Sequence, residues 1–514
     1  MGMTRETLAI LGELAQNPLE VAKVFNQALG LVNYNLERPA KSLVPVITPL
    51  RNMIARTPSE GGNAVHWKAI TGINTSDVVG VVEEGKRSGA ITTTLKDYTA
   101  PYATVGLEDY ITFSAKWAAK GFEDAQARMI RGLLWATMIA EEHCILGMNR
   151  TKLLGVSSKP TLSTDDEGGS IPDAVNVVVC VLALTYDGWR TATVTGGARV
   201  TTSRTNADGT TTAHGGYCGQ ISATTTQATG AEAPHTHSVL ASWDIVRGAV
   251  AYALYWGPTA GAAQTLGAIV TTNSYIITTA TGAGTQAANA TGLDADNSLN
   301  AYGYDGLISI IAGAGPEDSA MTSGALWQYQ ETGVVGVGTC LSTDSRGGIV
   351  EFETDLKAFW DNYRLSPDIA LVSSQELGTI TSLIIGAGGT ALFRFVLDGK
   401  SPDQIAAAVA GRTIQGGTVV GTYLNKYSMN GGSLMKVMLH PTVPPGTIIY
   451  WSSQVPYPLS DVTNLLEMDV REEYHEIDWP MITRKFEAGV YVDETLKCYF
   501  PAAFGMRTNI APLS

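Results

Sequence analysis

The sequence predicts an α+β protein into which an all-β sandwich is inserted. Over residues 103–114, apolar and polar side chains alternate, which is the period of a strand with one buried face. Over residues 122–146, apolar side chains recur every three or four positions, which predicts an amphipathic helix of about 37 Å. Between residues 153 and 302, Thr, Gly, Ala and Ser dominate, and short strand-like runs alternate with turn residues.

The ends of the long helix carry recognisable signals. Glu123 and Asp124 lie in its first turn, where negative charge opposes the helix dipole. Glu141 and Glu142 are assigned to its polar side, away from the apolar stripe. Gly147 is predicted as the C-cap, because glycine readily adopts the left-handed conformation that ends many helices.

The bulk composition limits the function classes. A chain of 514 residues, 45% of them hydrophobic, is long enough for about three or four domains. The 34 basic and 48 acidic residues give a net charge of −14, which disfavours wrapping nucleic acid through phosphate contacts. No apolar run reaches the roughly 18 residues of a membrane span, and the N-terminus does not resemble a secretory signal.

The cysteines indicate the redox environment. There are five, which is an odd number, and they are scattered through the sequence. We therefore expect reduced thiols in a cytoplasmic product. A disulfide between Cys180 and Cys218 stays open as an alternative.

The segment before the strand divides into an arm and a hairpin. Residues 1–60 hold two short predicted helices and then a proline-rich stretch without a clear period, which fits an extended arm better than a domain with its own core. Residues 61–97 read as two strands around the turn-rich sequence VVGVVEEGKRSG. Such a hairpin projects too far to be stabilised by its own contacts and needs a neighbour. Its predicted tip residues are Glu83, Glu84, Lys86 and Arg87.

The Thr- and Gly-rich region predicts a β-sandwich. The strand-like runs cover residues 176–184, 190–196, 238–246, 249–257 and 274–279. From about residue 235, the pattern of Trp243 followed by Gly248-Ala249-x-x-Tyr252-x-x-Tyr255-Trp256 resembles a fibronectin type III domain. In that family, the tryptophan and the tyrosine-bearing strand fill the core.

After residue 348, helix and strand patterns alternate. Residues 348–363 carry apolar positions in helical register, and Ser373 with Glu376 forms a capping box that begins a helix through residue 385. We also expect a helix over 401–410 and strands over 366–374, 433–440, 446–453 and 473–500.

Several motifs have part of the pattern of a binding site. Residues 386–391 follow an apolar run like a dinucleotide turn, but a helix cap precedes that run, so a flexible loop is favoured. The oxygen-bearing residues from Asp294 to Asp305 have part of the spacing of a calcium loop, but Leu299 replaces its glycine, so a solvated linker is favoured. The spaced oxygen ligands before Asp305 are Asp294, Asp296, Ser298 and Asn300.

The histidines do not form a site. His235 and His237 share one strand face, but no third ligand is suggested. His143, on the long helix, is expected to be packed or interfacial. We therefore expect no catalytic residue, no cofactor and no metal site.

Taken in order, these segments resemble the major capsid protein of tailed bacteriophages, which has the Hong Kong 97-type shell fold. The resemblance covers about 350 residues in two blocks and depends on the order and spacing of motifs that are individually weak. The matching motifs are YTAPYATVGLEDYITFSAKW, EEHCILG at 141–147, YDGLI at 304–308, residues 348–363 with PDIALVSSQELGTITSL, and EYHEIDWPMITRKFEAGVYVDETLKCYF. The long interval between Gly147 and about Tyr302 departs from the family pattern and is where the sandwich is inserted.

The resemblance implies a domain plan. Its parts are an N-terminal arm at 1–60, an E-loop hairpin at 61–97, a P-domain strand and spine helix at 98–152, the inserted sandwich at 153–302 (fibronectin III/Ig-like from about 235), a connector at 303–348, an A-domain at 349–465 and P-domain closing strands at 466–514. We expect the insert to fold autonomously and to face outward.

The resemblance also implies a structural function. Copies of the chain would assemble into pentamers and hexamers of an icosahedral head that encloses double-stranded DNA without sequence-specific binding. The head would be built in the host cytoplasm, with scaffold, portal or decoration proteins as further partners and without a membrane. The alternative is an extracellular adhesin or surface-layer β-sandwich protein, which the low charge and the Thr/Gly-rich region suggest.

Overall fold

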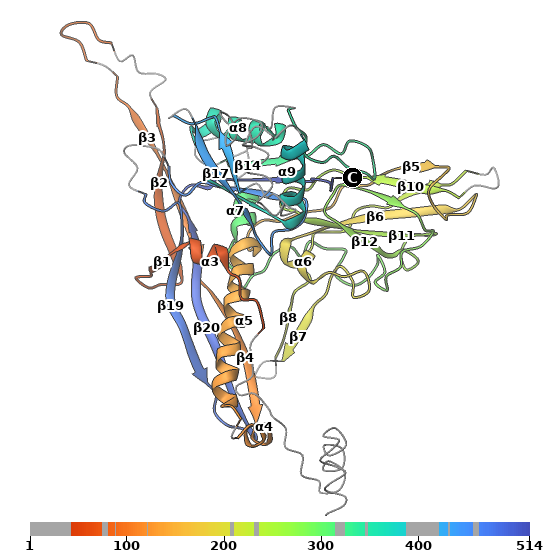
Figure 1. Ribbon diagram of the computed structural model, residues 1–514, viewed down its shortest axis with the longest axis horizontal. Coiled ribbons are helices and arrows are strands. Elements are labelled where there is room, and N and C mark those ends of the chain that lie inside the picture. The colour runs from red at the N-terminus through yellow and green to blue at the C-terminus, as the bar shows by residue number, and fades with distance from the viewer. Residues whose placement is uncertain are drawn as a thin grey trace, which may run out of the picture.

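The computed structural model shows an α+β protein with four parts: a projecting hairpin, a long sheet with a helix along it, a mixed sheet with helices, and a two-sheet insert (Figure 1). It describes residues 43–74, 81–87, 89–120, 122–205, 210–230, 236–313, 324–344, 348–386, 421–429, 432–455 and 462–513. The helices predicted before residue 43 and over 401–410, His235 and the Gly-rich turn after Gly386 lie outside these residues.

A long four-stranded sheet carries the spine helix. Its strand order is β1 (Ala55–Pro58), β19 (Leu466–Asp478), β20 (Lys485–Cys498) and β4 (Ala103–Thr112), with β1 parallel to β19 and the other pairs antiparallel. Helix α5 (Ala125–Gly147) lies along β4 and β20 (Figure 1). Its apolar stripe buries Met129 and Leu133 against Ala488 and Val490.

The ends of α5 differ from the prediction. The helix begins at Ala125 rather than residue 122, because the Asp124 carboxylate caps it by accepting hydrogen bonds from the amides of Gln126 and Ala127. It runs through Gly147, and Met148 is the C-cap with extended backbone. Gly147 serves close packing instead, since a Cβ there would lie 2.4 Å from the Tyr186 ring.

The strand before α5 is shorter than predicted. β4 ends at Thr112, and a short helix, α4 (Phe113–Ala118), follows it. The Thr112 hydroxyl caps this helix by accepting a hydrogen bond from the Ala115 amide at 3.3 Å, which ends the alternation two residues before the predicted boundary. The outer half of β4 also leaves Leu107 exposed, so the predicted apolar face is buried only near Ala103 and Val105.

The second sheet has six strands and mixed direction. Its order is β14 (Leu326–Tyr329), β21 (Phe504–Thr508), β18 (Ile448–Trp451), β15 (Ile369–Val372), β17 (Ser433–Leu439) and β16 (Thr422–Asn425). The helices of this region are α7 (Leu307–Gly313), α8 (Val350–Tyr363) and α9 (Ser374–Gly386), with the short 3-10 helix η1 (Pro501–Ala503). Phe352 and Phe359 of α8 pack edge-on against Tyr450 of β18, with ring centres 5.9 and 5.8 Å apart.

Two segments of the predicted plan have other roles. The predicted connector at 303–348 contains α7 and β14, and Tyr304, Leu307 and Ile311 are fully buried in the main core. The runs of apolar residues there are too short to show a period between the glycines. The final strand, β21, joins the six-stranded sheet rather than the closing strands, where it pairs with β14 and β18.

The insert consists of two facing sheets and a ribbon. One sheet orders β13 (Ser274–Ile277), β10 (Ser238–Ser242) and β5 (Thr161–Asp165), and the other orders β12 (Thr265–Val270), β11 (Ala251–Gly257), β6 (Asn176–Leu184) and β9 (Thr225–Ala228). The ribbon pairs β7 (Thr202–Thr205) with β8 (Thr211–His214). Valine, leucine and aromatic side chains from both sheets form one core between them.

The predicted strand over 190–196 is wrong. Residues 186–191 form helix α6 (Tyr186–Thr191), which the Thr185 hydroxyl caps by accepting a hydrogen bond from the Gly188 amide at 3.1 Å. A tight turn closed between Thr193 and Gly197 follows. Cys180 and Cys218 are buried free thiols, so the alternative of a disulfide between them is not realised.

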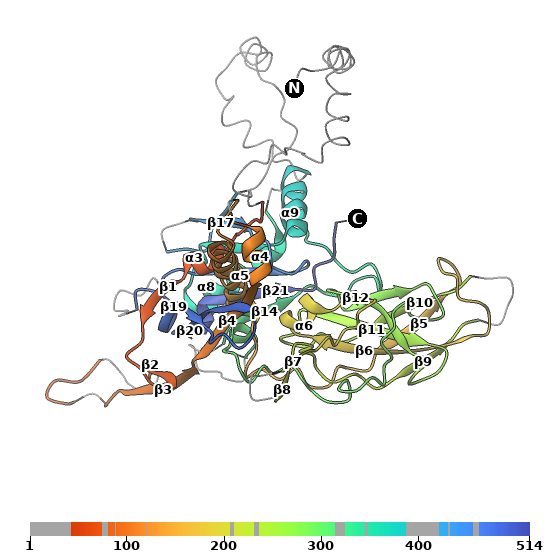
Figure 2. The ribbon, with the colours of Figure 1, turned by 90° about the horizontal axis from the view of Figure 1, so that it is seen from below.

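The insert also packs against the rest of the chain, and its autonomous folding stays a prediction. Tyr186 of α6 belongs to the main core and packs on Gly147. Arg247 donates hydrogen bonds to the Ile311 and Ala312 carbonyls at the end of α7, and the Asn509 side chain accepts from the Asn273 amide at 2.7 Å. In Figure 2 the insert and the hairpin extend to opposite sides of the body that contains α5.

The close approach at Gly147 can be tested on α5 itself. Gly147→Ala is expected to destabilise the protein by about 1–3 kcal/mol, because the added methyl group overlaps the Tyr186 ring and forces it to move. Gly132→Ala is the control, since a methyl group there meets nothing within 4 Å and alanine favours helix by about 0.5–1 kcal/mol. Urea unfolding measures both free energies. Equal stability of the two variants would contradict the packing role of Gly147.

Candidate assembly surfaces and the clamp on the arm

The hairpin formed by β2 (Ala64–Asn74) and β3 (Thr92–Pro101) projects away from the body (Figure 1). Apolar side chains are exposed along its outer part, and two of them, Ile70 and Leu95, are cross-strand neighbours that are 64% and 62% exposed. Val81, near the tip, is 86% exposed. A two-stranded hairpin with apolar residues in solvent lacks the packing that normally stabilises a sheet.

The predicted tip residues lie together on an exposed turn. Gly85 adopts a positive φ of 83° there, and the Lys86 amide donates to the Glu83 carbonyl at 3.0 Å. The Lys86 ammonium pairs with the Glu83 carboxylate inside the same turn. Glu84 and Arg87 are exposed. Contacts of these four residues with a neighbouring subunit stay a prediction.

Aromatic packing fixes the hairpin at its base. Trp67 of β2 stacks on Tyr98 of β3 with ring centres 5.6 Å apart, and Tyr499 meets Trp67 edge-on at 6.3 Å. The Lys497 ammonium lies 4.5 Å from the centre of the Tyr499 ring. The base is therefore anchored to the strand end of the long sheet, and the outer part of the hairpin is free of such packing among the described residues.

A second exposed apolar surface lies at the far end of the long sheet. There the turn between β19 and β20 carries Met481 and Ile482, and Ile482 is 90% exposed. Trp479 enters this turn, and Trp117 of α4 is also exposed. Figure 1 places α4 at the end of the sheet opposite the hairpin. The chain thus exposes apolar side chains at both ends of one rigid element.

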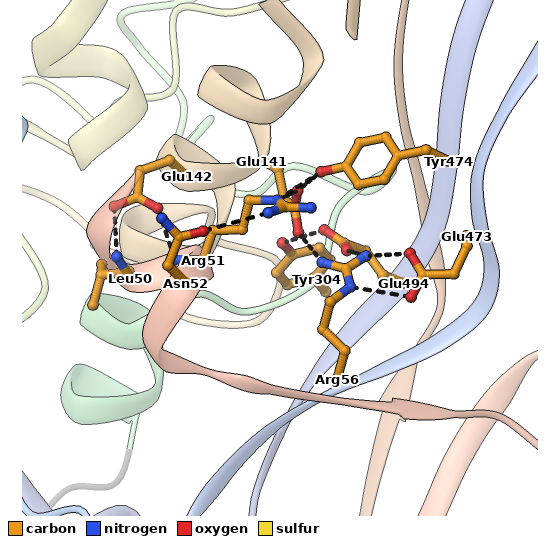
Figure 3. Close-up of polar contacts among 10 residues, drawn as sticks. All are labelled: Leu50, Arg51, Asn52, Arg56, Glu141, Glu142, Tyr304, Glu473, Tyr474 and Glu494. Atoms are coloured by element: carbon orange, nitrogen blue, oxygen red, sulfur yellow. Dashed lines mark hydrogen bonds and ion pairs between the residues drawn. The ribbon is translucent and has the colours of Figure 1, made fainter. Parts of the chain in front are cut away.

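The arm segment, residues 49–58, is held by the last turns of α5 (Figure 3). It consists of the helix α3 (Pro49–Met53) and β1. The Glu142 carboxylate caps α3 by accepting hydrogen bonds from the Leu50 and Arg51 amides at 2.9 and 2.8 Å. His440, at the end of β17, lies 2.8 Å from the same carboxylate. One side chain therefore ties the arm, the spine and the six-stranded sheet together.

Glu141 holds the two arginines of the arm segment. Arg51 donates through Nε to Glu141 Oε2 at 2.8 Å, and Arg56 bonds the other carboxylate oxygen. Tyr474 of β19 also donates to Glu141, and both guanidinium groups lie over its ring, 5.1 and 5.5 Å from the ring centre. Arg56 further bonds Glu473 and Glu494. Glu141 is fully buried, so it is not on the polar side of α5 as predicted.

Glu494 of β20 completes the cluster. It is fully buried, accepts from the Tyr304 hydroxyl at 3.2 Å, and bonds the Arg56 guanidinium at 3.3 Å. Burial and then the negative charge of Glu141 raise the pKa of Glu494 well above its ordinary value, and Arg56 opposes this rise. We call the group of Arg51, Arg56, Glu141, Glu142, Tyr304, Tyr474 and Glu494 the arm clamp.

The residues with calcium-like spacing accept hydrogen bonds from backbone amides near the start of the insert. Asp296 accepts a hydrogen bond from the Gly155 amide at 2.6 Å, and Ser298 accepts from Leu154 at 3.2 Å. Asp305 accepts from the Arg150 amide at 2.8 Å. These oxygens therefore join the two ends of the insert rather than converge on one point.

The histidines singled out in the sequence are packed. His237 is buried, with its ring nitrogens 3.1 Å from Asp166 and 2.9 Å from Asp173. His143 bonds the Tyr186 hydroxyl at 2.9 Å, and burial lowers the pKa of His143 to about 4, so it is neutral at neutral pH.

Within the described ranges, no three His, Cys, Asp or Glu side chains are grouped to hold a metal ion. No helix in that part of the chain is long and apolar enough to cross a membrane.

Comparison with known proteins gives similarities in structure only. No protein-family model and no curated protein matches the sequence. Among solved structures, the capsid of the native GTA particle aligns at 9% identity over 95% of this chain and 98% of that chain, with a TM-score of 0.41. The capsid of Myoviridae phage XM1 aligns at 9% identity over 94% and 98%, with 0.39. The capsid of cyanophage A-1(L) aligns at 10% identity over 95% and 99%, with 0.42. At this level of similarity we infer the function from the geometry of the chain itself.

The arm clamp predicts a large stability effect at Glu142. Glu142→Ala is expected to cost about 3–5 kcal/mol, because it removes the cap of α3 and leaves Nε2 of the buried His440 without its partner. Glu473→Ala is the control and should change stability by less than about 0.5 kcal/mol, since that side chain is 62% exposed. Chemical unfolding measures both, and a near-neutral Glu142→Ala would contradict the role of the cap.

Proposed function

We propose that this chain is the major capsid protein of a tailed bacteriophage, a structural subunit of the Hong Kong 97 type. The observation that carries the proposal is the β2–β3 hairpin, which exposes Ile70, Leu95 and Val81 where the chain itself offers nothing to cover them among the described residues. A hairpin of this kind gains stability when it lies on another subunit, so its conformation is explained by assembly.

The second exposed end supports a closed shell. Met481, Ile482 and Trp117 lie at the end of the long sheet that is opposite the hairpin. A subunit with apolar surfaces at both ends can contact several copies at once, and heterologous contacts that close generate rings. We therefore propose that copies form pentamers and hexamers, and that these close into an icosahedral head.

The charge of the chain fits a container better than a nucleic-acid binder. Its net charge of −14 disfavours wrapping DNA through phosphate contacts. The head would thus enclose double-stranded DNA as an acidic wall without sequence-specific binding. Scaffold, portal and decoration proteins are further proposed partners, the virion is the proposed location after assembly in the host cytoplasm, and the chemistry is that of interfaces rather than catalysis.

The function can be tested at the hairpin. In the double variant Ile70→Asp and Leu95→Asp, two charges replace adjacent exposed apolar side chains, so the subunit should fold normally while the assembled fraction falls by on the order of tenfold or more. Thr226→Asp, at an exposed position of β9 on the insert, is the control and should assemble as the wild type does.

Electron microscopy and sedimentation distinguish the outcomes of this experiment. Closed particles from the wild type, together with dispersed subunits from the double variant, support a shell protein. If the wild type forms only dispersed monomers under every condition, this result would contradict the proposal and favour the adhesin or surface-layer alternative. Unchanged assembly of the double variant would show that the hairpin does not form the contact.

A further inference from the structure

Two buried carboxyl groups meet inside the arm clamp. Glu141 of α5 and Glu494 of β20 are both fully buried, and their carboxyl groups bond the same guanidinium group. The Arg56 guanidinium bridges them, with one nitrogen on Glu141 and another 3.3 Å from Glu494 (Figure 3). Two carboxylates held close together and out of water repel each other, which favours a proton on one of them.

The charged groups around this pair come from the arm, from α5 and from β19 and β20. The acids are Glu141, Glu494 and Glu473, and the cations are Arg51 and Arg56. The other titratable groups facing the pair are Tyr304, Tyr474 and Cys144. Burial also raises the pKa of Tyr304 and of Cys144 well above their ordinary values, so both stay neutral and neither adds a negative charge at neutral pH. Water screens Glu473, which is largely exposed, but not Glu141 or Glu494.

We propose that Glu141 and Glu494 share one proton, and that this proton locks the arm segment onto the spine helix, so that detachment of the arm releases the proton and becomes easier as pH rises. The lock is a property of the single chain, and its use in shell assembly rests on the proposed function. In that setting, the arm would be held in acidic surroundings and freed for contacts with other subunits at higher pH.

The direction of the pH dependence follows from the causes of the raised pKa. Burial is the largest of these, and detachment of α3 and β1 admits water to the pair, so the pKa of Glu494 falls on opening. The loss of Arg56 acts in the other direction and is the smaller effect. Below the ordinary value of 4.5, both states hold the proton and pH has no effect. Between pH 4.5 and the raised pKa, only the attached state holds the proton. Each unit of pH therefore raises the equilibrium constant for detachment of the arm segment by at most about tenfold.

The experiment is hydrogen exchange with mass spectrometry on the unassembled full chain, from about pH 5 to about pH 9, corrected for the intrinsic exchange rate. The reporters are the amides of residues 49–58, including those of Leu50 and Arg51, which are bonded to Glu142. In the wild type, the opening constant of this segment should rise with pH by up to about tenfold per unit and then level off.

The variant Glu494→Gln isolates the proton. Glutamine cannot ionise, can still accept from Tyr304, and can donate its amide to Glu141, so the opening constant should become independent of pH. Glu473→Gln is the matched control, because it removes a carboxylate from the same arginine without touching the buried pair, and it should keep the wild-type profile. A pH slope that persists in Glu494→Gln, or an opening constant that falls with rising pH in the wild type, would overturn the proposal.

Infrared spectroscopy provides a second readout that does not depend on opening. The wild type at neutral pH should show the carbonyl band of a protonated carboxylic acid, Glu473→Gln should keep it, and Glu494→Gln should lose it. Should Glu494→Gln fail to fold, Glu141→Gln removes the shared proton from the other side and should lose the same band. Absence of the band in the wild type refutes the lock. Because the chain is studied unassembled, that result leaves the shell function to be decided by the hairpin variant.

Discussion

Two adjacent carboxylates at the end of α5, Glu141 and Glu142, hold together parts of the chain that are far apart in sequence. Glu142 caps α3 of the arm and contacts His440 next to the six-stranded sheet. Glu141 bonds both arginines of the arm and Tyr474 of the long sheet. The spine helix is therefore the element through which the arm and both large sheets are placed relative to one another.

Burying the charges of Glu141 and Glu142 costs desolvation free energy, which hydrogen bonds to neighbouring groups offset. Each carboxylate oxygen of Glu141 and Glu142 accepts at least one hydrogen bond from a cation, a hydroxyl or a backbone amide. A buried ion pair adds little stability over apolar packing, but removing one partner is strongly destabilising. Such a cluster therefore specifies one arrangement of the arm more than it adds to the overall free energy of folding. A uniquely placed arm fits the proposed role of the chain as a repeating subunit.

The sequence predicts the elements whose pattern is periodic and misses the contacts that break the pattern. The alternation in β4 and the helical repeat in α5 are visible, because each buries one face over many residues. A periodic pattern predicts Glu141 and Glu142 on the polar side, because it counts every charge as solvent-exposed and cannot foresee an arginine partner more than 80 positions away. The signal that points to them is the pair of carboxylates one helical turn before the apolar pair Ile145 and Leu146.

The short elements α7 and β14 cannot be predicted from the sequence for a related reason. α7 and β14 span only 7 and 4 residues between glycines, so no period develops, although Leu307 and Ile311 are fully buried. The oxygen-rich run from Asp296 to Asp305 has a spacing that suggests an ion, yet its acceptors are matched to amides of the chain across the junction. The spacing of these residues in the sequence shows that their oxygens are near one another along the chain. Their hydrogen-bond partners lie in a distant segment and can be identified only from the tertiary structure.

The junction of the insert has a consequence for how such a chain can change over evolution. The chain leaves the spine at Asn149 and returns at Asn300, whose amide donates to the Asn149 carbonyl at 2.7 Å. The Asn149 side chain also bonds the Ser298 carbonyl at 2.9 Å. The two ends of the insert therefore lie side by side. A change in the length of the insert would leave the positions of the spine helix and the following segment unchanged. Tyr186 of the insert packs on Gly147 in the main core, so any sequence that replaced the insert would need a side chain of similar size at this position.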